Sequence, residues 1–199
     1  WKGFELKVGL NATCFNNRPS GAKQRFIGLY KELFKEFSSA EFTIYEPIDC
    51  SVTNWFNDIN NIKPIKTSIN SNSSTKQYFK SVNFWKKELL NNKYDFFEGF
   101  NLPFVSSKNS KNILTIHDIR GLNKNLNIFK LNLYKQVLRY SVNNADHIIT
   151  VSEFMKNEIE KLFPNKKISV VYNGINLEEF KEFETKSLPL FKKNFNIPN

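Results

Sequence analysis

The sequence lacks the features that would mark a secreted or membrane-spanning protein. Only two cysteines, Cys14 and Cys50, occur among its 199 residues. They are too few for a disulfide framework and lack the spacing of metal ligands, so we interpret them as reduced thiols. No apolar run approaches the ~18–20 residues of a membrane span. The first residues show neither a signal-peptide nor a transit-peptide pattern. We therefore expect a cytoplasmic protein.

The glycine-rich fingerprints of common nucleotide-binding sites are also absent. Neither G-x-G-x-x-G nor G-x-x-x-x-G-K-[ST] occurs in the sequence, which contains only seven glycines. This absence weighs against a dinucleotide-binding site and against a P-loop.

Acidic residues are scarce in the middle of the chain. Residues 60–140 contain 14 basic and only 4 acidic side chains, whereas the two flanking segments are each balanced, so this segment accounts for the net charge of +10. A localised basic excess suits an anionic partner such as a phosphate, a nucleic acid or acidic lipid headgroups. A solvated lysine-rich surface explains it equally well, and both interpretations stay open at this point.

Aromatic bulk is plentiful, with 20 Phe, 7 Tyr and 3 Trp, enough for the core of one large domain. Short, nearly continuous apolar runs predict strands at residues 6–10, 42–45, 94–97, 112–116, 147–151 and 168–172. The polar residues 51–75 predict a loop that contains a short helix or strand.

Helical apolar spacing alternates with these strands. Phe26, Tyr30, Leu33 and Phe37 follow such spacing within residues 22–37. The same pattern predicts helices over about residues 76–92, from Leu131 to about Asn143, and after Ser152. Buried strands separated by helices indicate an α/β fold, namely a Rossmann-like, doubly wound, mainly parallel sheet covered on both faces.

Because such sheets bind ligands at the carboxyl ends of their strands, the residues that follow each strand are the candidates for a binding site. The first strand leads through Arg18–Arg25, which includes Gly21, directly into a helix. The N-terminus of a helix offers free N–H groups to a phosphate. By itself this signal is weak, since many strands are followed by a glycine loop and a helix.

Three further strands end in distinctive polar residues. His117 and Asp118 follow the strand at 112–116, where a histidine can donate a hydrogen bond or transfer a proton near neutral pH. The other histidine, His147, opens a strand, and we interpret it as structural. Ser152 is explained by helix capping, and Asn173 begins an ordinary Asn-Gly turn.

In combination, these strand ends resemble the retaining glycosyltransferases of the GT-B fold, which pair two Rossmann-like domains across a cleft. The matching stretches are residues 20–25, 29–33, 113–118, 145–154 and 170–180. The resemblance implies that residues 1–180 form the N-terminal, acceptor-side domain. It implies that residues 181–199 are the interdomain linker and the start of a C-terminal donor-binding domain, whose Glu-x7-Glu motif is not present. We therefore expect the chain alone to be inactive.

The resemblance also implies roles for individual residues. Gly21 and Ala22 would approach the donor diphosphate and sugar, and His117 would contact the donor sugar near the reacting centre as the catalytic residue. The supporting residues of the cleft would be Arg25, Asp118, Ser152 and Asn173. Lys23 stands where many members have a small residue. No Asp-x-Asp occurs, which fits a family that needs no metal and no cofactor beyond the nucleotide sugar as co-substrate.

The function implied is transfer of a sugar from a nucleotide sugar to a glycan or lipid-linked acceptor with retention, in cell-surface polysaccharide synthesis. The basic middle segment would face an anionic acceptor or the inner face of an anionic membrane, in peripheral contact. Two rival functions remain, and a regulatory or degenerate, non-catalytic protein is a third possibility. A nucleotide-sugar epimerase of GT-B type shares the architecture. A basic nucleic-acid-binding α/β module would explain the charge but not the strand ends, so we expect no nucleic-acid partner.

Overall fold

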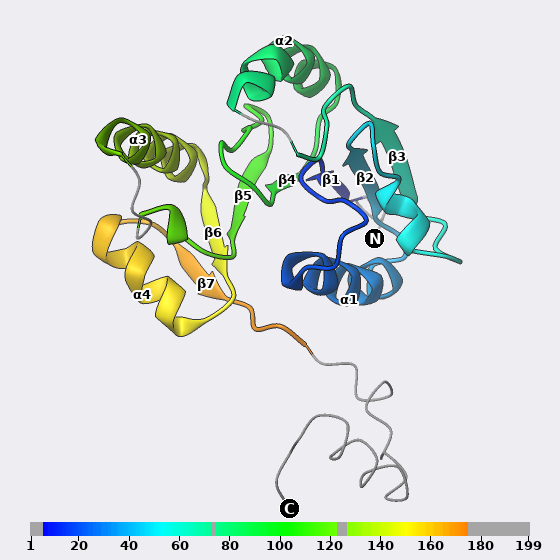
Figure 1. The fold of residues 1–199 in the computed structure, drawn as a ribbon. Helices are drawn as coiled ribbons and strands as arrows, with labels where there is room; N and C mark the ends of the chain where they lie inside the picture. The colour runs from blue at the N-terminus through cyan, green and yellow to red at the C-terminus, as the bar shows by residue number, and fades with distance from the viewer. Residues whose placement is uncertain (1–5, 73–74, 123–126, 175–199) are drawn as a thin grey trace, which may run out of the picture.

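The computed structural model describes residues 6–72, 75–122 and 127–174, which form one parallel sheet with helices packed on it (Figure 1). The strands are β1 (Lys7–Asn11), β2 (Glu41–Glu46), β3 (Ile62–Lys66), β4 (Phe96–Gly99), β5 (Lys111–Ile116), β6 (His147–Thr150) and β7 (Ile168–Val170). The α-helices are α1 (Gly21–Glu36), α2 (Thr75–Asn91), α3 (Ile128–Asn144) and α4 (Glu153–Leu162). Two short 3-10 turns occupy Val52–Trp55 and Arg120–Leu122.

The seven strands lie in the order β3-β2-β1-β4-β5-β6-β7, and every neighbouring pair is parallel. The chain first moves outward from β1 to β3 and then crosses back to β4, beside β1. The winding direction therefore reverses between β1 and β4, which is the position where open α/β sheets form their ligand crevice. The doubly wound α/β fold predicted from the sequence is confirmed.

The two faces of the sheet carry different helices. Helix α1 connects β1 to β2, so its crossover moves along the sheet toward the β3 edge. Helices α2, α3 and α4 lie in crossovers that move in the opposite direction, toward the β7 edge. Right-handed crossovers place these two sets on opposite faces, as Figure 1 shows. The side chains agree, because Leu10 of β1 packs with α1 and Leu114 of β5 packs with α3. Residues that share a face with Leu10, including Glu98 of β4, are therefore directed toward α1.

Most predicted helices and strands are confirmed to within a few residues, and three segments differ from the prediction in their bounds or in their buried residues. Phe34, rather than Phe37, completes the buried face of α1, and Phe37 caps the helix end at 47% exposure. The strand predicted at 94–97 begins two residues later, at Phe96. Residues 51–75 contain both a 3-10 turn and an edge strand, β3.

The predicted domain boundary after residue 180 lies outside the described residues and stays a prediction. In the part of the chain that is described, no helix is both long and apolar enough to cross a bilayer.

Candidate functional site

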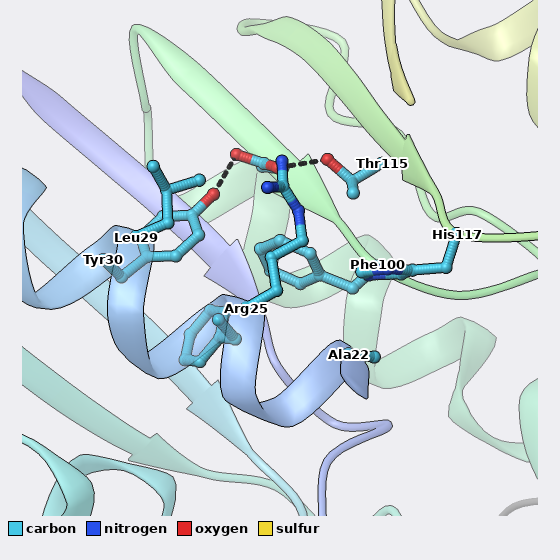
Figure 2. Close-up of a pocket in the computed structure, with 9 residues that line it drawn as sticks. Ala22, Arg25, Leu29, Tyr30, Phe100, Thr115 and His117 are labelled. Carbon is cyan, nitrogen blue, oxygen red and sulfur yellow. Dashed lines mark hydrogen bonds between the residues drawn. The ribbon is translucent and has the colours of Figure 1, made fainter. Parts of the chain in front are cut away.

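A small pocket opens between α1 and the carboxyl ends of β4 and β5, beside the point where the sheet reverses its winding (Figure 2). Arg25 and Tyr30 of α1 line it on one side, and Glu98, Thr115 and His117 line it on the sheet side. The sequence brings these groups together because α1 lies over the face of the sheet on which Glu98 lies. The pocket therefore combines a cation, a carboxylate and an imidazole in a small, largely buried volume.

The carboxylate of Glu98 is the centre of a buried hydrogen-bond network. Its side chain is only 8% exposed. The Tyr30 hydroxyl donates to one carboxylate oxygen, and the Thr115 hydroxyl donates to the other at 2.6 Å (Figure 2). Burial raises the pKa of Glu98, and the two hydroxyl donors together with the Arg25 charge oppose this rise. The network holds the end of β4 to α1 and to β5.

Arg25 is a buried cation that lines the same pocket (Figure 2), and its charge favours the ionised form of Glu98. Burial lowers its pKa, and the nearby Tyr30 and Glu98 counteract the shift. Guanidinium does not lose its proton in proteins, so Arg25 remains a fixed positive charge. Its Nη1 also donates to the backbone carbonyl oxygen of Tyr172 at 3.3 Å. Arg25 thus connects α1 to the segment that leaves β7.

His117 follows β5 directly and is half-buried at the edge of the pocket. Burial lowers the pKa of its imidazole, the positive charge of Arg25 lowers it further, and Asp118 partly opposes the shift. The ring is therefore neutral at neutral pH, with one nitrogen able to donate a hydrogen bond and the other able to accept one. His147, by contrast, pairs its Nε2 with the Ser169 hydroxyl at 2.9 Å, outside this pocket.

The first turn of α1 lies next to the pocket and is open. Ser20 caps the helix by accepting a hydrogen bond from the Lys23 amide at 3.2 Å. Gly21 is exposed, and a Cβ placed on it would meet nothing within 4 Å. Ala22 lines both this pocket and a second hollow beside residues 14–20. Lys23 turns aside, with its Nζ 4.3 Å from the centre of the Trp55 ring. The helix end can therefore accept an anion at close range.

The remaining predicted site residues do not line the pocket. Asp118 is half-buried beside His117, and its charge raises the pKa of Tyr134 further than burial alone. Ser152 caps α4, accepting a hydrogen bond from the Met155 amide at 3.2 Å. Asn173 is exposed and follows Tyr172, the residue bound by Arg25. Asn173 is thus adjacent to the pocket through the backbone, whereas Ser152 has a helix-capping role in this structure.

Tyr30, Glu98 and Thr115 were not predicted as site residues. One signal was present in the sequence, because Glu98 is a carboxylate at the end of an otherwise apolar strand, a position that requires a partner if it is buried. Its partners lie 68 and 17 residues away along the chain, which no local pattern could indicate.

No three His, Cys, Asp or Glu side chains gather into a potential metal site within the described segments. Cys14 lines the second hollow, and burial raises the pKa of its thiol to about 12. It is therefore a neutral thiol rather than a nucleophile.

Comparisons with known proteins agree with one another. A family model described as Glycosyltransferase Family 4 matches residues 48–179. The chain is 33% identical over 69 residues to the O-antigen chain mannosyltransferase RfbU of Salmonella typhimurium, an alignment of 34% of this chain and 20% of that protein. It is also 33% identical over 93 residues to the uncharacterized glycosyltransferase MJ1178 of Methanocaldococcus jannaschii, covering 46% and 25% of the two chains.

Among solved structures, the fold is similar to Anabaena Alr3699/HepE. The complex of that protein with UDP and glucose matches with a TM-score of 0.57 and 10% identity, over 96% of this chain and 50% of that chain. Its complex with UDP-glucose matches with a TM-score of 0.58 and 12% identity, over 98% and 50%. The chain therefore spans about half of the solved protein and a smaller part of the two curated relatives.

Proposed function

The chain belongs to Glycosyltransferase Family 4, and from this premise we propose that it supplies the acceptor-side half of an enzyme that transfers a sugar from a nucleotide sugar to a glycan or lipid-linked acceptor. The GT-B resemblance predicted from the sequence is confirmed by the family match and the doubly wound fold. The name of the mannosyltransferase relative supports a role in cell-surface polysaccharide synthesis, and the UDP-glucose complex of the structural neighbour supports a nucleotide-sugar donor.

The observation that carries the proposal is that His117 and Arg25 line one pocket, next to the open first turn of α1. In the proposed mechanism, His117 donates a hydrogen bond to the donor sugar near the reacting carbon. The N–H groups of the turn that begins at Gly21 and Ala22 approach the diphosphate. Arg25 adds positive potential where negative charge develops on the leaving group. Each of these interactions strengthens as the sugar–phosphate bond breaks, so together they lower the barrier.

Retention of configuration completes the proposal. The acceptor hydroxyl would attack from the face that the diphosphate leaves, and the leaving phosphate would take the acceptor proton. The protein would then act mainly by positioning and electrostatics, without a metal or a further cofactor. Asp118 and Asn173 would support the cleft from outside the pocket, and Ser152 would do so through the start of α4.

The proposed partners are anionic or lipid-linked acceptors and the inner surface of an anionic membrane, but no nucleic acid. The excess of basic side chains in residues 60–140 supports an anionic partner. The imidazole and guanidinium meet in one small pocket rather than along an extended basic groove, which suits a sugar phosphate better than a nucleic-acid strand.

The test is a turnover assay on the full-length protein with a panel of nucleotide sugars, following both release of the nucleotide and transfer of labelled sugar to an acceptor. His117→Ala should lower kcat by on the order of 10²-fold. His147→Ala is the matched control and should retain wild-type turnover. Isomerised donor without transferred sugar would instead indicate an epimerase, and an unchanged kcat in the His117 variant would remove its catalytic assignment.

A further inference from the structure

Helix α3 is apolar on two faces. Leu138 and Val142 are buried against the sheet. On the outer face, Phe129 is 81% exposed, and Leu133 and Tyr140 are each 49% exposed. These three residues stand four and seven positions apart and therefore form one stripe along the helix. A helix that only covers a sheet has a polar outer face, so this stripe requires a further explanation.

The stripe continues into an apolar groove between α2 and α3. Trp85, Leu89 and Leu90 of α2 line this groove together with Val105. Tyr140 belongs to both the groove and the stripe, and Leu90 is 66% exposed. We call the stripe and the groove together the α2–α3 face.

Cations flank this face. Lys130 and Arg139 are exposed on α3, one on each side of the stripe, and the helix contains no acidic residue. Lys86 and Lys108 line the groove. Glu88, the acidic residue of α2, accepts hydrogen bonds from the side-chain amide of Asn92 at 2.8 Å and from the Tyr45 hydroxyl. The apolar surface is therefore accompanied by positive charge, and the carboxylate of α2 is already hydrogen-bonded.

We propose that the α2–α3 face seats the protein on the surface of a lipid bilayer that contains anionic lipids. Aromatic and aliphatic side chains enter the boundary between headgroups and acyl chains, while flanking lysines and arginines pair with lipid phosphates. A second copy of the chain fits poorly, because two such faces would bring like charges together. This inference deepens the proposed function and rests on it for the nature of the acceptor.

The direction of α3 relates this face to the pocket. Helix α3 follows the carboxyl end of β5, the end at which His117 lies, and runs back along the sheet (Figure 1). The Phe129 end of the stripe is thus at the edge of the sheet where the pocket opens, and the groove is at the opposite edge. The pocket lies on the opposite face, next to α1, so an acceptor on a lipid anchor would extend around the carboxyl edge of the sheet to enter it.

The experiment is co-sedimentation of the full chain with vesicles of phosphatidylcholine alone or of phosphatidylcholine mixed with phosphatidylglycerol. We expect binding to the anionic vesicles only, weakened by salt. Phe129→Ser combined with Leu133→Ser should lower the apparent affinity on the order of tenfold. Lys130→Gln combined with Arg139→Gln should lower it about fivefold for each charge removed.

The matched control replaces the same residue types on α4, as Phe154→Ser combined with Leu162→Ser. These side chains are 70% and 49% exposed, but α4 carries Glu153 and Glu158 among its exposed or half-buried residues, so it should not face an anionic surface. The control should bind like the wild type, and circular dichroism should show that all variants are folded. Equal binding to both vesicle types, or an equal loss in the α4 control, would overturn the proposal. Because no turnover is measured, failure here is separate from failure of the glycosyl-transfer proposal.

Discussion

The guanidinium of Arg25 in α1 donates a 3.3 Å hydrogen bond to the backbone carbonyl oxygen of Tyr172, a residue 147 positions further along the chain. The positive charge of the same guanidinium also favours the ionised form of the buried Glu98 carboxylate. One side chain therefore stabilises both the pocket and the segment that follows the last described strand.

Substitution of Arg25 should separate these two contributions. Arg25→Lys retains a cation near Glu98 but loses the reach and the fork to Tyr172, and should reduce the free energy of unfolding by about 1 kcal/mol. Arg25→Leu removes the positive charge from beside a buried carboxylate and should cost about 2–3 kcal/mol. Urea unfolding of both variants is the measurement, and equal losses would show that the charge of Arg25 does not stabilise Glu98.

The hydroxyl of Tyr30 gives a second test of the network. Tyr30→Phe removes one donor from Glu98 while keeping the ring that packs in the core, and should reduce stability by about 1–3 kcal/mol. Tyr140→Phe is the control, because that side chain is 49% exposed. Thermal or urea unfolding compares the two. A negligible loss for Tyr30→Phe would mean that water replaces the missing donor.

The lowered pKa of His117 predicts a specific pH dependence of stability. Below its ordinary value of 6.5, the unfolded chain binds a proton at this residue more readily than the folded protein does. The free energy of unfolding should therefore be unaffected by this residue above that pH and should decrease as the pH falls below it. The decrease ends once His117 is protonated in the folded protein as well. His117→Gln does not titrate and should lose less stability between about pH 7.5 and about pH 5.5. Parallel losses in the two proteins, measured by urea unfolding, would contradict the lowered pKa.

Two glycines should respond to alanine in opposite directions. A Cβ on Gly99 of β4 would lie 2.7 Å from the Phe104 ring, which is 1% exposed and has no room to move. Gly99→Ala should therefore destabilise the protein by about 1–3 kcal/mol. A Cβ on Gly28 of α1 would meet nothing within 4 Å, so Gly28→Ala should stabilise it by about 0.5–1 kcal/mol through helix propensity. Their melting temperatures, measured side by side, check both signs.

The fold was predictable because its signals are local. Continuous apolar runs such as residues 112–116 and helical spacing such as that of Trp85 and Leu89 depend on near neighbours, and the structure places strands and helices there. The shift of β4 has a tertiary cause. Tyr94 is buried and shares a hydrogen bond of 2.7 Å with the Tyr45 hydroxyl, so it packs in the core without belonging to the strand.

The candidate site was predictable only in part. His117, Gly21 and Arg25 stand at strand and helix ends, which general rules connect with ligands, and the structure brings all three to the same edge of the sheet. Their roles in the reaction stay predictions. The network around Glu98 depends on residues that come together only when α1, β4 and β5 pack. Hydrophobic periodicity predicts the elements themselves but not which of their polar side chains will be in contact.

The outermost strand β3 has a further consequence. It pairs with β2 on one side only, and Lys63, Pro64 and Lys66 are exposed along its length. Proline withholds a backbone donor, and a lysine such as Lys63 on a sheet edge repels an approaching copy of the same strand. The Lys66 ammonium is instead turned back to Glu46 and the Cys50 carbonyl oxygen. The same polar residues and proline that kept β3 from being predicted as a strand thus make the β3 edge of the sheet a poor template for aggregation. This should help a protein with so aromatic a core to remain soluble at high concentration.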